Sequence, residues 1–195
     1  MNLTKNAETP APSPIRSFLI AADGFEEVEG LTVVDLLRRA GFVCEIVSLS
    51  DGETVTGSHG IRIGADRFFS ETVPEDYDAV ILPGGLRGTE ALKADRRVLS
   101  LLQRMHAAGK LTAAVCAAPT VLAEAGLLVG CRATCYPGME EKLTGALPCT
   151  DSVVRDGTVI TSRGAGTSIA FALAIIACLD SQEHADEIGR KIVYS

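Results

Sequence analysis

Short, continuous runs of apolar residues alternate with segments of helical periodicity along this chain, and this alternation constrains the fold more than any other feature. The runs are expected to be buried strands, and they cover residues 17–22, 42–49, 79–82 and 111–115. Strands that are apolar on both faces occur in parallel sheets with helices packed on each side. The sequence therefore predicts an α/β fold in which a mostly parallel sheet lies between two helical layers.

Apolar residues spaced three and four apart, followed by helix-ending residues, define the expected helices. These helices cover residues 28–40, 90–108, 117–125, 168–179 and 183–193. Two segments are predicted to be hairpins, 54–63 and 153–160, the second because Asp156-Gly157 supplies the positive φ angles of a tight turn. The segment 1–15 is rich in proline and polar residues, so we expect a flexible N-terminal tail and a single domain over residues 16–195.

The charge and the cysteine content exclude several classes of protein. The 195 residues carry 18 basic and 25 acidic side chains, and the net charge of -7 gives no attraction to nucleic acid or to an anionic membrane. The six cysteines contain no C-x-x-C pair and are too few for a disulfide scaffold. The N-terminus does not resemble a secretory signal, and the longest apolar stretch, 169–179, is too short to span a bilayer. We therefore expect a cytoplasmic protein with no nucleic-acid or membrane partner.

Ligands of parallel α/β sheets bind outside the carboxyl ends of the strands, so the functional residues are expected there. Five segments follow predicted strands in this way: 23–29, 83–88, 116–119, 135–138 and 162–166. Four of these segments contain glycine, and the remaining one, 116–119, begins with a cysteine.

Cys116 is the strongest candidate for a catalytic residue. It stands between the expected strand 111–115 and a helix whose start is fixed by Pro119, because proline is tolerated only in the first turn. There the thiol would face unpaired backbone N–H groups and the positive end of a helix, which favour the thiolate. The small residues Ala117 and Ala118 permit the sharp turn of a nucleophile elbow. We predict a reactive nucleophile, with a buried inert thiol as the alternative.

Two further groups of residues are expected to support this cysteine. Gly84 and Gly85 let the backbone approach a ligand, and the N–H of Ala117 is a second donor for an oxyanion, although a plain tight turn is the alternative. Glu29 lies four residues before an apolar helix position and so points inward, where burial would raise its pKa and let it exchange a proton with the thiolate. Glu26 and Glu27 are expected only to complement the helix dipole.

The three histidines, His59, His106 and His184, are well separated in the sequence, so no metal site is predicted. His59 lies at the tip of the expected hairpin 54–63 and is included among the candidate substrate-binding residues. None of the five strand-end segments contains a histidine, which disfavours a Cys–His protease mechanism.

Four motifs, in this order, resemble those of the ThiJ/PfpI superfamily, in the branch of the Parkinson's-disease-associated protein deglycase. They are GFEEVE at 24–29, LPGG at 82–85, AVCAAPT at 114–120 and TSRGAGT at 161–167. The resemblance covers residues 17–193 and implies a flavodoxin-like three-layer sandwich, a homodimer, and a nucleophile-elbow cysteine hydrogen-bonded to a protonated glutamate. By motif match these two residues are Cys116 and Glu29.

The chain departs from the superfamily at two positions. Tyr136 stands where relatives often have a histidine, and it can donate a hydrogen bond to a substrate but is a poor base near neutral pH. Ala117 stands where protease-like members have a histidine, which argues against peptidase activity.

The resemblance implies cysteine-dependent detoxification of reactive carbonyls, by glutathione-independent glyoxalase or protein deglycase chemistry that needs no metal or organic cofactor. The partner would be a small reactive carbonyl or a glycated adduct. Two alternatives stand beside it. One is a non-enzymatic sensor of oxidative stress, or chaperone, in which Cys116 oxidises to a sulfinate held by Glu29. The other is an amidotransferase-like hydrolase, which needs a histidine that the strand ends lack.

Overall fold

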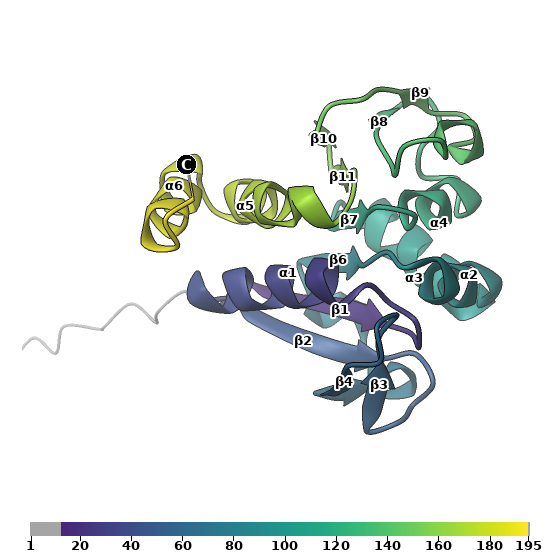
Figure 1. The fold of residues 1–195 in the computed structure, drawn as a ribbon, viewed down its shortest axis with the longest axis horizontal. Helices are drawn as coiled ribbons and strands as arrows, with labels where there is room; N and C mark the ends of the chain where they lie inside the picture. Colours follow the sequence, from purple (N-terminus) through teal and green to yellow (C-terminus); the bar gives the residue numbers. More distant parts are fainter. Residues whose placement is uncertain (1–12, 195) are drawn as a thin grey trace, which may run out of the picture.

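Seven strands form the central sheet of the computed structural model, which describes residues 13–194 (Figure 1). Their order is β10-β11-β7-β6-β1-β2-β5, and every neighbouring pair is parallel except β10 and β11. The strands are β1 (Arg16–Ala21), β2 (Val43–Ser48), β5 (Arg67–Phe68), β6 (Ala79–Leu82), β7 (Leu111–Val115), β10 (Val153–Asp156) and β11 (Val159–Ser162). The predicted mostly parallel α/β sheet is therefore confirmed.

Among the described residues, six helices cover the two faces of this sheet. They are α1 (Glu27–Arg39), α2 (Leu86–Ala94), α3 (Arg96–Ala107), α4 (Pro119–Glu124), α5 (Ser168–Leu179) and α6 (Gln182–Lys191). Successive residues of β1 point to opposite sides, so that Leu19 joins a core with α1, α5 and α6, whereas Ile20 joins a core with α2, α3 and α4. This alternation requires apolar residues at every position of a buried strand, and it produces the three layers predicted from the sequence.

The helix expected over 90–108 is two helices, because the helical conformation is interrupted at Asp95. The backbone of this residue is extended (φ -89°, ψ 108°), and its carboxylate accepts a hydrogen bond from the N–H of Arg97 at 2.8 Å. Asp95 thus caps α3, and the separate α2 begins earlier than expected, directly after Gly85. The prediction of one continuous helix was wrong, because the apolar spacing in the sequence does not show that Asp95 caps a new helix.

Both predicted hairpins are present. Strand β3 (Thr54–Thr56) pairs antiparallel with β4 (Arg62–Gly64), and β10 pairs with β11 around Gly157, whose φ is +57°. The first hairpin is docked on the turn that precedes α1, since the N–H of Gly24 donates to Thr56 O at 2.7 Å and that of Ser58 donates to Phe25 O at 2.8 Å. The hairpin tip is thereby held beside the carboxyl end of β1.

The remaining elements are short. A two-residue pair, β8 (Arg132–Ala133) and β9 (Leu147–Pro148), precedes β10, and four single-turn 3-10 helices cover Phe69–Glu71, Pro74–Asp76, Glu140–Lys142 and Ala165–Thr167. Of the predicted tail, residues 1–12 lie outside the described residues, and Ile15 already bonds to the sheet, its carbonyl accepting the N–H of Val43 at 2.9 Å. Within residues 13–194, no helix is both long and apolar enough to cross a bilayer. All six cysteines are free thiols.

Candidate active site

A cavity of about 700 Å³ lies at the carboxyl ends of β1, β6 and β7, where the sequence predicted the function to lie. Four of the five predicted strand-end segments contribute to its lining: Gly24 and Glu26; Gly85, Leu86 and Arg87; Cys116 and Ala117; Tyr136 and Pro137. The fifth segment, 162–166, is not part of the lining but packs against it. A Cβ added at Gly164 would lie 3.5 Å from the Tyr136 ring and 3.9 Å from Glu29 Oε1. The predicted candidates His59 and Tyr136 both line the cavity.

The sharp turn predicted at Cys116 is present. Its φ of +64° lies in the left-handed region that L residues rarely adopt. The turn is held on both sides, since the N–H of Cys116 donates to Ser162 O at 2.9 Å and its carbonyl accepts the N–H of Tyr136 at 2.8 Å. The surrounding backbone therefore fixes a strained conformation that presents the thiol to the cavity.

Of the two kinds of group predicted to face the sulfur, the backbone N–H groups are present and the end of a long helix is not. Helix α4 has only six residues and starts at Pro119, so the thiol does not stand at the end of a long helix. The backbone N–H groups that face the sulfur are those of Gly85 and Ala117, both among the donors predicted for an oxyanion. Gly85 has a φ of +87°, and an added Cβ would lie 2.3 Å from Gly24 O, so this close approach requires glycine.

Glu29 lies against Cys116 behind the cavity wall. The Glu29 side chain comes from the first turn of α1, is 1% exposed and is hydrogen-bonded to the Cys116 thiol. Its Oε2 also accepts the N–H of Gly84 at 2.8 Å. A Cβ at Gly84 would lie 2.4 Å from Glu29 Oε2 and 2.6 Å from Cys116 Cβ, so a side chain there would separate the pair. The N–H of Gly84 is thus committed to Glu29, and the predicted oxyanion role falls to Gly85 and Ala117.

Burial changes the protonation of both members of the pair. It raises the pKa of Glu29 to about 7, against the opposing hydrogen bonds from Cys116 and Gly84. Burial, together with the neighbouring charge of Glu29 and its hydrogen bond, raises the pKa of Cys116 to about 12, against the lowering effect of the N–H groups of Gly85 and Ala117. The predicted rise in the pKa of Glu29 is therefore present, whereas the predicted lowering of the Cys116 pKa is opposed by a desolvation that the sequence does not show.

The two groups are best described as one titrating unit. The pair gives up its first proton near the Glu29 pKa of about 7, and one proton then remains between the carboxyl and the sulfur. When Glu29 holds that proton, the sulfur is a thiolate that accepts hydrogen bonds from the N–H groups of Gly85 and Ala117. A nucleophile next to a proton donor is the chemistry that this arrangement provides.

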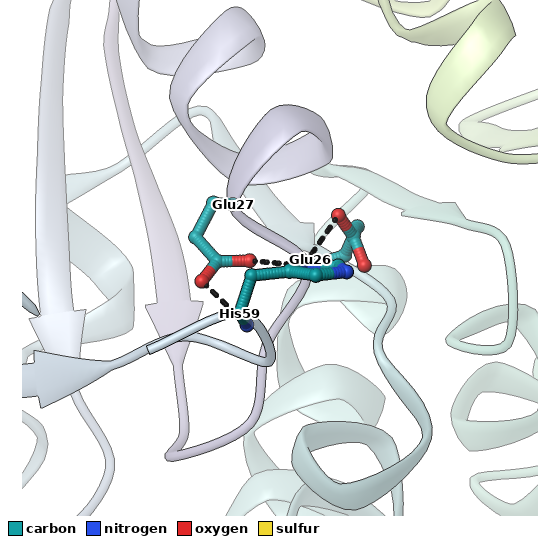
Figure 2. A group of neighbouring side chains, drawn as sticks. All are labelled: Glu26, Glu27 and His59. Atoms are coloured by element: carbon teal, nitrogen blue, oxygen red, sulfur yellow. Dashed lines mark hydrogen bonds and ion pairs between the residues drawn. The ribbon is translucent and has the colours of Figure 1, made fainter. Parts of the chain in front are cut away.

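A second wall of the cavity comes from the β3–β4 hairpin, which the strand-end rule did not identify; of its residues, only His59 was a predicted candidate. Glu27, expected only to complement a helix dipole, is 3% exposed and binds this hairpin (Figure 2). Its Oε1 accepts the N–H of His59 at 2.8 Å, and its Oε2 lies 3.1 Å from both the His59 Nδ1 and the Ser58 Oγ. An added Cβ at Gly57 would lie 2.2 Å from Glu27 Cδ. In the sequence, the glycines and polar residues of 57–60 were the feature that could have indicated this part of the cavity.

These contacts set the charges of this second wall. Burial alone would raise the pKa of Glu27, but hydrogen bonds from its own backbone N–H, from His59 and from Ser58 outweigh it and hold the pKa at about 2. The hydrogen bond to Glu27, with the charge of Glu26, raises the pKa of His59. The carboxylate of Glu27 is therefore ionised throughout the physiological range.

This protein is thus an α/β sandwich with a mostly parallel sheet, and its candidate active site is built around a cysteine on a strained turn with a buried carboxyl against the sulfur. The model of the DJ-1/PfpI family matches residues 16–178. This chain belongs to the DJ-1/PfpI family, and the resemblance found in its motifs is confirmed.

Three relatives illustrate the similarity. The dj-1beta protein of Drosophila melanogaster is 38% identical over 179 residues, which are 91% of this chain and 96% of that one. Its crystal structure superposes with a TM-score of 0.90, covering 94% of this chain and 100% of that one at 38% identity. A protein of Pyrococcus abyssi named as a deglycase is 33% identical over 159 residues, 80% of this chain and 95% of that one. The structure of oxidised Toxoplasma gondii DJ-1 is 33% identical with a TM-score of 0.88, covering 93% of this chain and 99% of that one.

Proposed function

We propose that this protein is a cysteine-dependent, cofactor-free enzyme that detoxifies reactive carbonyls, as a glutathione-independent glyoxalase or a protein deglycase. The observation that carries the proposal is the hydrogen-bonded pair of Cys116 and Glu29 at the cavity, with the N–H groups of Gly85 and Ala117 at the sulfur. The similarity to a Pyrococcus abyssi protein named as a deglycase supports the choice of substrate class.

The reaction on a 2-oxoaldehyde begins when the Cys116 thiolate attacks the aldehyde carbon. A C–S bond forms, and the carbonyl electron pair moves to oxygen, which the N–H groups of Gly85 and Ala117 bind. Glu29, which holds the proton of the pair, first gives it to this oxygen and so becomes a carboxylate. The carboxylate then takes the proton from the carbon that bears sulfur and returns it to the neighbouring carbon, while the hydroxyl proton passes to the neighbouring oxygen, which yields a thioester of a 2-hydroxy acid. Water hydrolyses the thioester and restores the thiol. The net change is the addition of one water, so no external oxidant or reductant is consumed.

The environment in which this chemistry would operate is part of the proposal. Family membership favours a homodimer, and six free thiols suit the reducing cytoplasm as the place where the protein acts. Tyr136 lies at the cavity with 52% of its surface exposed, where its hydroxyl would bind a substrate oxygen rather than remove a proton. Sedimentation of the purified protein tests the dimer, and a single monomeric species would contradict it.

The direct test is production of lactate from methylglyoxal in the absence of glutathione. We expect Cys116→Ala and Glu29→Gln to lower kcat/KM by at least a hundredfold, because each removes one member of the pair. Cys149→Ala is the matched control, since this half-buried cysteine is not among the residues that line the cavity. Full turnover in both site variants would overturn the mechanism.

A second candidate function is sensing of oxidative stress through the same sulfur. It is favoured by the half-buried position of Cys116 and by the relative described as oxidised Toxoplasma gondii DJ-1. Mass spectrometry after graded peroxide separates it from unselective oxidation, because Cys131, Cys149 and Cys178 are also half-buried and serve as internal controls. Selective sulfinate at Cys116 supports sensing, and equal oxidation of all four cysteines contradicts it.

A further inference from the structure

We propose that Glu26, Glu27 and His59 form a binding site for a divalent cation of the Zn²⁺ class in the wall of the Cys116 cavity (Figure 2). The proposal does not depend on the carbonyl chemistry. The donors come from two elements far apart in sequence, the start of α1 and the tip of the β3–β4 hairpin. Each residue offers one ligand atom, and the three atoms all lie within 4.8 Å of one another. Sequence analysis predicted no metal site, because the docking of this hairpin is a tertiary feature.

The spacing of the donor atoms suits a tetrahedral ion. His59 Nδ1 lies 3.1 Å from Glu27 Oε2 and 3.5 Å from Glu26 Oε1. Zinc binds imidazole nitrogen and carboxylate oxygen at about 2.0–2.2 Å, which places tetrahedral ligands about 3.3 Å apart. The two separations bracket that value, and the two carboxylate oxygens lie within 4.8 Å of each other.

The surrounding contacts fix the ligands in this orientation. Glu27 Oε1 is engaged by the N–H groups of His59 and Ile61, at 2.8 Å and 3.4 Å, which turns Oε2 toward the imidazole. The Ser58 hydroxyl lies between the two carboxylates, 3.0 Å from Glu26 Oε2 and 3.1 Å from Glu27 Oε2, and can donate its hydrogen to either one. Supporting hydrogen bonds of this kind orient the ligands of known metal sites.

The charge and the type of donor also indicate a cation. The two carboxylates supply two negative charges, against about half a positive charge from the end of α1, so the site is negative when the imidazole is neutral. One imidazole and two carboxylates suit zinc, whereas calcium and magnesium prefer oxygen ligands alone. Glu26, Ser58 and His59 line the cavity, which gives an ion an entry path and room for a water as its fourth ligand.

The test is a titration of the full chain with Zn²⁺ against a chromogenic chelator, in the wild type and in a Cys116→Ser background that removes the nearby thiol. We expect one equivalent to bind in both. His59→Asn and Glu26→Gln should each weaken binding at least tenfold, and both residues are outside the hydrophobic core, so the variants are expected to fold. His184→Asn is the matched control, because its ring is paired with Asp180 at 2.6 Å in α6.

Cobalt separates this site from the cysteines. Co²⁺ bound by Glu26, Glu27 and His59 gives weak d–d bands without a sulfur-to-metal charge-transfer band, and this is the expected spectrum. A charge-transfer band would assign the metal to thiolates and overturn the proposal. So would the absence of saturable Zn²⁺ binding, its loss in Cys116→Ser, or equal affinities in the wild type, His59→Asn and Glu26→Gln.

Discussion

Gly84 has no side chain, and this allows Glu29 and Cys116 to touch. Its φ is outside the left-handed region, so an alanine there is opposed only by sterics: the added Cβ would lie 2.4 Å from Glu29 Oε2 and 2.6 Å from Cys116 Cβ. We expect Gly84→Ala to reduce activity toward methylglyoxal about as far as Glu29→Gln does, and to lower the free energy of unfolding by about 1–3 kcal/mol. Gly64→Ala, with nothing within 4 Å, is the control. An active Gly84→Ala enzyme would show that contact within the pair is dispensable.

Glu29 also has a predictable effect on stability. Its pKa rises from 4.5 to about 7 on folding, so the folded state binds more protons than the unfolded state between these values. The free energy of unfolding must therefore fall as pH rises through this window, by at most about 3 kcal/mol. Glu29→Gln removes this dependence. Urea denaturation below and above the window should therefore show that the free energy of unfolding of the variant, relative to that of the wild type, is higher at the higher pH. Parallel pH profiles for the two proteins would contradict the raised pKa.

Residue roles were only partly predictable from sequence. The inward direction of Glu29 follows from helical spacing, and the elbow at Cys116 follows from Pro119 and its small neighbours. The thiol pKa does not follow, because it depends on how much water the fold removes from the sulfur and on the charge of Glu29 beside it. Glu27 was misassigned for the same reason, since nothing local marks a carboxylate as buried under a distant hairpin.

At the scale of elements, the strands and most helix ends were predictable because apolar runs and terminating glycines are local signals. The boundary between α2 and α3 was not, because Asp95 caps a helix without interrupting the apolar spacing around it. We expect Asp95→Ala to lower the free energy of unfolding by about 1 kcal/mol, through loss of the 2.8 Å bond to the N–H of Arg97. Chemical denaturation measures this, with Glu141→Ala as an exposed acidic control. Equal losses in the two variants would exclude a capping role.

At the scale of the whole molecule, the parallel sheet brings residues from 24 to 142 to one cavity. The rule that ligands bind at strand carboxyl ends found four segments of this cavity from sequence alone. It could not place the β3–β4 hairpin, whose tip is docked on the turn before α1 by contacts that include the buried carboxylate of Glu27 and two backbone hydrogen bonds. The position of Cys116 at the cavity was thus predictable from the sequence, whereas the wall formed by the β3–β4 hairpin is evident only in the tertiary structure.

The account rests on Cys116 and Glu29 titrating as one unit, and the rate of Cys116 alkylation by iodoacetamide as a function of pH tests this most directly. With Glu29 present, the rate should rise near pH 7, where the pair loses its first proton. In Glu29→Gln, burial of an isolated thiol should move the rise above the pKa of about 8.5 of an ordinary cysteine. Coincident profiles for the two proteins, both centred on the ordinary thiol value, would contradict it.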